Sequence, residues 1–323
     1  MGRVIFFSII ALSGVALLAS SSAAGAEGQA NARLRNSDDM WVAKSIPAQL
    51  PTGVTHHTYH SACMNRDVGY CIYLPPSYEK SPEKRYPVIY TLHGATGNEM
   101  SSIDSAKVLH DGIISGRWPE IILVTPNGGR ATLYMDTADG RFMAETTFMK
   151  ELIPHIDQAY RTIAARHARC IEGFSMGGRG STMLAMKYPE MFCSLFDQAG
   201  NVYPVAQQFD DPATTAEMKQ GIGPDRQKWI DYDPYLNLKK NLNLIKNGGL
   251  RIQIFCGTKD DGHLPSIRDF HKALLDAGVD HTYMEIEDMA HERKKMIAQY
   301  SAIWFDYHVE SMRRAAAKAG PAQ

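Results

Sequence analysis

The 323-residue sequence lacks a strong charge of either sign and lacks metal-binding motifs. Its 34 lysines and arginines nearly balance its 35 aspartates and glutamates, and no run of five or more basic residues occurs. Nucleic acids and anionic membrane surfaces are bound by clustered cations, so the composition excludes both as expected partners. No His-Glu-x-x-His motif or clustered Cys/His spacing is present. His56, His57 and His60 lie close together in the sequence, but alone they are weak evidence for a metal site. We therefore expect no metal and no cofactor.

Long apolar runs are also scarce, and the longest lies at the N-terminus. Arg3 precedes the apolar residues 4–19, and Ala24-Gly25-Ala26 offers the small side chains that a signal peptidase reads. The run is shorter than the ~20 residues of a membrane-spanning helix, which favours a cleaved signal over an uncleaved anchor. We expect residues 1–26 to be a signal peptide and the mature chain to be secreted or periplasmic, without stable membrane insertion.

Cysteine is rare, and its number is odd. Of the five cysteines, Cys170, Cys193 and Cys256 sit in or beside apolar runs, which is typical of small buried hydrophobic residues. Cys63 and Cys71 flank a turn-like segment, so a cross-strand disulfide and two free thiols both stay open for them.

The order of the remaining segments predicts one α/β domain. After a polar lead-in at 27–52, two strand-like segments joined by a turn predict an antiparallel hairpin. Apolar runs then alternate with helix-like segments, which is typical of a mostly parallel sheet with helices on both faces. We place this domain at 53–310 and a C-terminal tail at 311–323. Residues 201–249 form a polar insert, either a pocket wall or lid, or an irregular surface connection with one helix.

One serine lies between glycines where a predicted strand runs into a predicted helix. In Gly173-Phe174-Ser175-Met176-Gly177 the glycines remove side chains that would collide in a sharp strand-to-helix turn, so the turn can hold the Ser175 hydroxyl exposed. The same turn puts the N–H of Met176 at a helix N-terminus, where it can donate to an oxyanion. We predict Ser175 as a nucleophile.

A nucleophilic serine needs a base and an orienting carboxylate, which follow it along the chain in this type of fold. Asp260 and Asp261 follow a predicted strand, and His291 follows the last one. We favour Asp260, with Asp261 as the alternative and a helix N-cap as the structural role for either. His291 has the expected position, although it could also be a surface histidine. For His263 the default is a solvated or packing role.

The second oxyanion donor is expected from the loop after an earlier strand. Residues 87–94 end a predicted strand in His93-Gly94, which makes the N–H of Ala95 the candidate, with His93 supporting the loop. These parts together indicate acyl transfer through a covalent acyl-enzyme.

Several segments resemble the esterase D-like family of α/β-hydrolases. They include YPVIYTLHG, ELIPHIDQAYRT, EGFSMGGRGS and CGTKDD, within about residues 59–308. The family includes feruloyl and acetylxylan esterases, mycolyltransferases and S-formylglutathione hydrolase. The resemblance implies an α/β-hydrolase fold with Ser175, Asp260 and His291 as the triad. The sequence departs from feruloyl esterases at Met289-Ala290-His291, where they carry Gly-Gly-His, and in the loop LYMDTADGR.

The resulting hypothesis is an exported serine esterase that acts on a small ester or an esterified plant polysaccharide, with feruloyl or acetyl groups as the acyl part. An acyltransferase of the mycolyltransferase type and a non-catalytic carbohydrate-binding protein are the alternatives. Export disfavours S-formylglutathione hydrolase, whose substrate is cytosolic. The sequence leaves the oligomeric state open.

Overall fold

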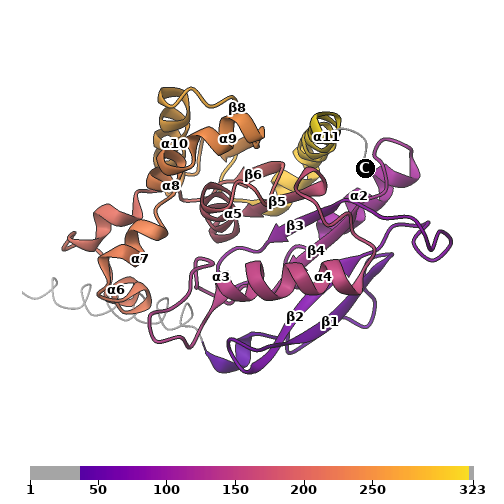
Figure 1. Ribbon diagram of the computed structural model, residues 1–323, viewed down its shortest axis with the longest axis horizontal. Helices are drawn as coiled ribbons and strands as arrows, with labels where there is room; N and C mark the ends of the chain where they lie inside the picture. The colour runs from indigo at the N-terminus through magenta and orange to yellow at the C-terminus, as the bar shows by residue number, and fades with distance from the viewer. Residues whose placement is uncertain (1–36, 320–323) are drawn as a thin grey trace, which may run out of the picture. The chain divides into compact units, whose positions relative to one another are not determined.

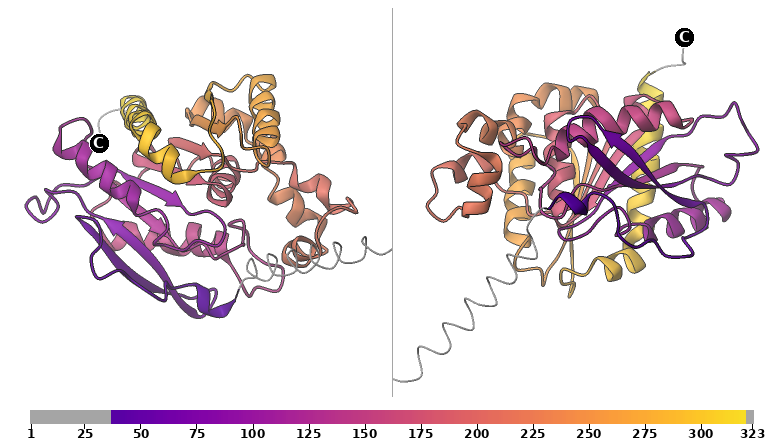
Figure 2. Two further views of the ribbon diagram at one scale, coloured as in Figure 1. Left: turned by 180° about the vertical axis from the view of Figure 1, so that it is seen from behind. Right: turned by 90° about the horizontal axis from the view of Figure 1, so that it is seen from below.

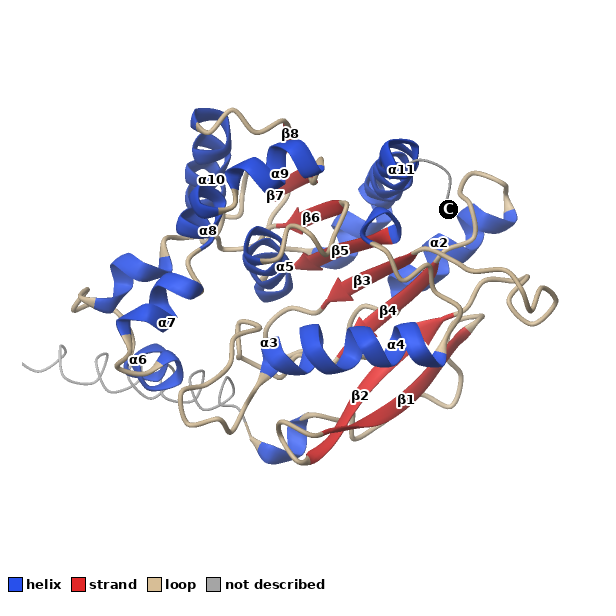
Figure 3. Cartoon of the chain, in the orientation of Figure 1, coloured by secondary structure: helices blue, strands red, loops and turns tan. Residues whose placement is uncertain are grey.

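A central sheet of eight strands organises the molecule. The computed structural model describes residues 37–319, apart from the side chain of Glu217. The strand order is β1-β2-β4-β3-β5-β6-β7-β8 (Figures 1 and 3). The strands are β1 (Val54–Ser61), β2 (Arg66–Tyr73), β3 (Val88–Leu92), β4 (Ile122–Pro126), β5 (Arg169–Phe174), β6 (Ser194–Gln198), β7 (Arg251–Gly257) and β8 (His281–Ile286).

The direction of the strands confirms the predicted sheet. β1 and β2 form the antiparallel hairpin, and β2 joins β4 in the antiparallel sense. All other neighbouring strands are parallel. Every residue of β3, β4, β5 and β6 is buried, as expected for parallel strands covered on both faces.

Helices cover both faces of this sheet. α2 and α11 lie on one face, and α4, α5, α8 and α10 lie on the other (Figures 1 and 2). In α10 the buried Ile267, Phe270 and Leu274 recur at a spacing of three and four, which makes the apolar stripe that faces the sheet. The α-helices are α2 (Asp104–Ile114), α3 (Ala144–Thr146), α4 (Ile153–Ala159), α5 (Met176–Lys187), α6 (Ala216–Ile222), α7 (Arg226–Asp231), α8 (Pro234–Lys240), α9 (Leu242–Gly248), α10 (Leu264–Asp276) and α11 (Arg293–Ala319). A π-helical segment, η2 (Thr147–Leu152), joins α3 to α4, and short 3-10 helices are η1 (Asp38–Met40), η3 (Arg166–Ala168) and η4 (Val205–Phe209).

The last helix corrects the predicted C-terminal boundary. α11 continues past residue 310 to Ala319, and both Ser311 and Met312 are buried. The Ser311 hydroxyl donates to the carbonyl of Tyr307 and accepts a hydrogen bond from Arg251. The packed domain therefore extends at least to Met312, and α11 continues as a mostly exposed helix to Ala319.

The described part of the lead-in is also packed on the domain. Met40 and Trp41 are buried, and the carbonyl of Trp41 accepts a 2.8 Å hydrogen bond from the N–H of Gly69. The side-chain amide of Asn127 donates to the carbonyl of Met40. Residues 40–41 are thus part of the domain, which begins before residue 53. The predicted signal peptide at 1–26 lies outside the described residues.

The insert at 201–249 is helical, so of its two predicted forms the irregular connection with one helix is wrong. It contains η4 and four helices, α6 to α9. The predicted single helix at 237–246 is split at Asn241, whose side-chain amide donates to the carbonyl of Met186 in α5. The ring of Tyr203 lies 4.0 Å from the guanidinium carbon of Arg179, so the insert begins beside α5.

All five cysteines are free thiols. The Cys63 thiol lies 3.3 Å from the hydroxyl of Thr147, whereas that of Cys71 lies 3.3 Å from the sulfur of Met100. The two thiols therefore contact different parts of the chain, and the disulfide between them does not form in this structure. Among the described helices, none is long and apolar enough to cross a membrane.

Candidate active site

Ser175 occupies a sharp turn between β5 and α5. Its backbone has φ 58° and ψ −120°, and its N–H donates to the carbonyl of Gln198 at 2.9 Å. A Cβ atom on Gly173 would lie 2.3 Å from the carbonyl carbon of Gly177, and one on Gly177 would lie 2.1 Å from the carbonyl oxygen of Leu92. Only glycine fits at these two positions, so the motif is required by the close approach of α5 to the sheet.

Asp260 and His291 meet at the carboxyl edge of the same sheet. Asp260 follows β7, His291 follows β8, and the Nδ1 of His291 lies 2.6 Å from Oδ2 of Asp260. The carboxylate of Asp260 is buried, whereas Asp261 is exposed and has no hydrogen bond to His291. Of the two aspartates that the sequence left open, Asp260 is the partner of His291.

The environment of His291 favours its neutral form. Burial lowers its pKa below the ordinary value of 6.5, and the hydrogen bond to Asp260 opposes this shift. The ring of Phe174 packs against the imidazole, with 4.4 Å between the ring centroids. A neutral imidazole with Nδ1 bound to a carboxylate keeps Nε2 free to accept a proton.

Ser175 and His291 are brought to the same edge but are not hydrogen-bonded to each other. Within residues 37–319, neither the Ser175 hydroxyl nor Nε2 of His291 has a hydrogen-bond partner. Catalytic hydrogen bonds are often long in free enzymes and shorten when substrate binds.

The two predicted oxyanion donors lie in segments that abut Ser175. A Cβ atom on Gly94 would lie 3.4 Å from Cβ of Ser175, so the loop that carries Ala95 lies against the serine. In the described part of the chain, the N–H groups of Ala95 and Met176 have no acceptor. Two unpaired donors beside one serine suit a developing negative charge.

Hydrogen bonds of His93 and Tyr134 stabilise the loop that carries Ala95. The buried His93 ring contacts the carbonyl of Gly94 through Nδ1 and accepts a 3.0 Å hydrogen bond from the N–H of Gly128 at Nε2. The hydroxyl of Tyr134 donates to the carbonyl of His93. His93 therefore has the supporting position that the sequence indicated.

Left-handed backbone conformations gather at this edge of the sheet. Thr96, Tyr134, Ser175, Ala199 and Asp288 follow five different strands and have φ values between 53° and 63°. Such conformations are costly for residues other than glycine and concentrate at functional sites.

His263 is a residue that the sequence reasoning missed. Its Nδ1 lies 2.8 Å from Oδ1 of Asp260, and its ring stacks on that of His291 with 4.0 Å between centroids and 5° between planes. The sequence allowed a packing role, which the stack on His291 bears out, but it did not indicate the hydrogen bond to Asp260. The signal in the sequence is the spacing Asp-x-x-His directly after a strand, because residues three apart share one side of a helical turn.

Asp260, His263 and His291 also form the one cluster within residues 37–319 that could hold a metal ion. Their ligand atoms all lie within 4.8 Å of one another. Two imidazoles and a carboxylate suit zinc. However, both Nδ1 atoms face the carboxylate, so an ion would have to replace both imidazole protons and dismantle the hydrogen bond between Asp260 and His291.

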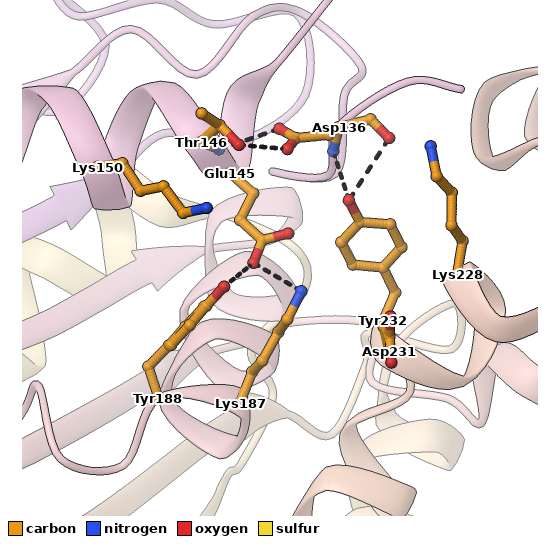
Figure 4. Close-up of a pocket in the computed structure, with 9 residues that line it drawn as sticks. All are labelled: Asp136, Glu145, Thr146, Lys150, Lys187, Tyr188, Lys228, Asp231 and Tyr232. Carbon is orange, nitrogen blue, oxygen red and sulfur yellow. Dashed lines mark hydrogen bonds and ion pairs between the residues drawn. The ribbon is translucent and has the colours of Figure 1, made fainter. Parts of the chain in front are cut away.

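A separate cavity of about 210 Å³ lies at the far end of α5 (Figure 4). Lys187 and Tyr188 lie at that end, twelve and thirteen residues after Ser175, which corresponds to about 18 Å along a helix. Both side chains bind the buried carboxylate of Glu145 (Figure 4). Three lysines and three carboxylates balance in its lining, which gives no preference for an anion or a cation.

Comparisons with known proteins identify the family of the chain. A profile for the family described as "Putative esterase" matches residues 61–292. The chain belongs to this family. An esterase of Mycobacterium tuberculosis is 30% identical over 149 residues, which cover 45% of this chain and 32% of the relative. An endo-1,4-beta-xylanase/feruloyl esterase of Xylanibacter ruminicola is 27% identical over 190 residues, 56% of this chain and 25% of the relative. The chain thus matches a third or less of the length of these relatives.

Solved structures of other esterases share the fold. A ferulic acid esterase superposes with a TM-score of 0.65 at 25% identity, over 80% of this chain and 98% of the other. An S-formylglutathione hydrolase from Agrobacterium tumefaciens gives a TM-score of 0.63 at 21% identity, over 80% and 95%. The predicted α/β-hydrolase fold is confirmed.

Proposed function

We propose that this esterase-family protein is an exported serine carboxylic-ester hydrolase that acts on feruloyl or acetyl esters of plant polysaccharide. The observation that carries the proposal is the 2.6 Å hydrogen bond between Asp260 and His291 at the sheet edge where Ser175 also lies. A histidine held by a carboxylate and open at its other nitrogen is the base that a serine nucleophile requires.

The proposed reaction proceeds in two halves. Ser175 Oγ attacks the ester carbonyl, its proton passes to Nε2 of His291, and the N–H groups of Ala95 and Met176 bind the oxyanion. When the tetrahedral intermediate collapses, the bond to the alcohol oxygen breaks and His291 gives the proton to the departing alcohol. Water then attacks the acyl-enzyme with His291 again as base, which releases the acid and restores Ser175.

The acyl group is inferred from relatives. A xylanase/feruloyl esterase and a ferulic acid esterase are among the similar proteins, and both names point to feruloyl esters. The apolar N-terminal run supports export, since it has the length and small following residues of a cleaved signal peptide.

The experiment compares the wild type with Ser175→Ala on methyl ferulate, acetylated xylan and p-nitrophenyl acetate. We expect ferulate release by the wild type and none above background by the variant. Turnover of p-nitrophenyl acetate alone would support esterase activity and contradict the feruloyl specificity. Equal activity of the two proteins would overturn the serine mechanism.

A second assay separates hydrolysis from transfer, and a third tests export. Adding a free sugar to the reaction should leave the ratio of acid to alcohol released at one, because water is the acceptor. Acylated sugar as the main product would identify a transferase.

Expression of the full chain in a bacterium with a periplasm should yield extracytoplasmic protein that begins at Glu27.

A further inference from the structure

The carboxylate of Asp260 is shared between two imidazole rings. Oδ2 faces Nδ1 of His291 at 2.6 Å, and Oδ1 faces Nδ1 of His263 at 2.8 Å. The carboxylate is almost fully buried, so these rings supply hydrogen bonds that water cannot. Each Nδ1 carries its proton toward the carboxylate, because Asp260 has only acceptors when ionised.

The chain fixes His263 in this position independently of its ring. The N–H groups of His263 and Leu264 both donate to the carbonyl of Asp260, at 3.1 and 2.9 Å, which closes a tight turn before α10. His263 is the N-cap residue of α10, yet its side chain makes no capping hydrogen bond. The imidazole is therefore not used for the helix and is directed at Asp260.

The ring of His263 also restricts the ring of His291. The two planes are 5° from parallel with centroids 4.0 Å apart, and Phe174 packs at 4.4 Å. A rotation of His291 about its Cβ–Cγ bond would break both the stack and the hydrogen bond to Asp260. The direction of Nε2 thus depends on two contacts that His263 makes, one with the carboxylate and one with the ring.

We infer that His263 is a positioning residue, which holds Asp260 from its second oxygen and covers one face of His291 so that Nε2 points to Ser175. This inference rests on the proposed function, in which His291 is the base. It goes beyond the triad because it assigns a fourth side chain to the orientation of the base.

The stack has an electrostatic consequence. Two protonated imidazoles in parallel contact repel each other, so a charge on His263 opposes protonation of His291. Removing His263 takes away this repulsion, exposes the ring of His291 to water and leaves Asp260 with one donor. All three effects raise the pKa of His291, so the acid limb of the pH profile moves to higher pH.

The other titratable groups around His263 and His291 do not reverse the expected rise in the pKa of His291. Burial raises the pKa of Asp197 on β6 to about 6 and that of the Cys256 thiol on β7 to about 12. Three ion pairs in the neighbouring segments carry no net charge: Lys259 with Asp288, Arg293 with Asp104, and Lys295 with Glu292. The exposed Asp261 is present in the wild type and in every variant, so it does not change the direction of the shift.

Three substitutions separate the two contacts of His263. His263→Asn keeps an N–H donor near the position of Nδ1 and removes the ring, His263→Phe keeps a stacking ring and removes the donor, and His263→Ala removes both. We expect kcat on p-nitrophenyl acetate to fall about tenfold or more in the Ala and Phe variants and about threefold in the Asn variant, with KM nearly unchanged. The acid limb should move up in all three variants, because each removes the charge that the imidazole of His263 can carry.

The matched control is His271→Asn, also on α10 but bonded to His281 outside the site. It should leave kcat and the acid limb unchanged. Equal kcat and pH profiles in the wild type and all three His263 variants would overturn the inference while leaving the esterase intact.

A titration without substrate keeps this test separate from the proposed function. The pKa of His291, read from its ring protons by NMR, should rise in His263→Asn whether or not any ester is turned over. An unchanged pKa would overturn the inference, whereas absence of Ser175-dependent turnover by the wild type would overturn the proposed function alone.

Discussion

Two histidine–carboxylate pairs contact the same central sheet and differ in what they leave free. His308 of α11 contacts Glu172 of β5 at 3.2 Å and the hydroxyl of Ser194 at 2.9 Å, so both ring nitrogens have protein partners. His291 contacts Asp260 through Nδ1, and Nε2 has no partner within residues 37–319. The side chain of His308 is fully buried, whereas about a third of that of His291 is exposed.

This difference shows that a histidine–carboxylate pair is not by itself a catalytic device. Glu172 lies three residues before Ser175 along β5, yet its pair with His308 can only fix α11 to the sheet, because water and substrate cannot reach it. The pair of His291 and Asp260 differs by one unbound nitrogen and by exposure. We expect reactivity to follow from these two features.

The largest effect should come from breaking the exposed pair. In Asp260→Asn, we expect kcat to fall by about 10³–10⁴-fold, because the amide favours the wrong tautomer of His291. Steady-state kinetics on p-nitrophenyl acetate checks this. The neighbouring Asp261→Asn is the control and should stay within about twofold. Comparable losses in both variants would contradict the assignment.

Breaking the buried pair should affect stability and leave the chemistry unchanged. His308→Leu leaves the carboxylate of Glu172 buried beside the hydroxyl of Thr91 without its histidine, which should lower the free energy of unfolding by about 3 kcal/mol or more. Urea denaturation measures this loss. The folded variant should keep the wild-type kcat. A variant that folds normally but loses activity would place His308 in the chemistry.

Asp197 is a buried carboxylate that is not hydrogen-bonded to a histidine, so it can be compared with the two histidine–carboxylate pairs. Asp197 accepts hydrogen bonds from Thr182 and Gly200, and burial raises its pKa to about 6. The folded state then holds a proton that the unfolded state releases near pH 4, so this group costs stability as the pH rises from 4 through 6.

The matching variant is Asp197→Asn, which keeps both contacts and removes the titration. Its free energy of unfolding relative to the wild type should increase by about 2 kcal/mol between pH 4 and pH 7. Urea denaturation at the two pH values measures this difference. A difference that does not vary with pH would show that Asp197 keeps an ordinary pKa.

The smallest effect concerns the pH dependence of the wild type. In the proposed mechanism His291 must be neutral to accept the serine proton, and burial holds its pKa below the ordinary 6.5. Activity should therefore be complete above pH 6.5 and decline at lower pH, with the midpoint below 6.5. A profile of kcat/KM against pH locates this midpoint. A midpoint above 6.5 would show that the hydrogen bond to Asp260 affects the pKa of His291 more than burial does.

Most of the fold could be predicted from the sequence because its signals are local. Parallel strands buried on both faces read as continuous apolar runs, and the glycines around Ser175 mark a close approach of backbone to backbone. The chain order also placed Asp260 and His291 after the correct strands. Each of these signals depends on neighbours in the sequence or on the general topology of the fold.

The rest depends on contacts that composition does not encode. Whether Asp260 or Asp261 faces His291 depends on how one loop turns. The stack of His263 on His291 depends on β8, which begins 18 residues after His263 in the chain. The burial of Trp41 and of Met312 likewise follows from surfaces that other segments provide. Such tertiary contacts override local polarity.

The most direct measurement is labelling by a fluorophosphonate, followed by mass spectrometry of the modified peptide. Wild type and folded His308→Leu should both carry the label on Ser175, and His291→Ala should carry almost none, because only the open histidine activates the serine. Labelling of another residue, or equal labelling of Ser175 in His291→Ala, would contradict the account.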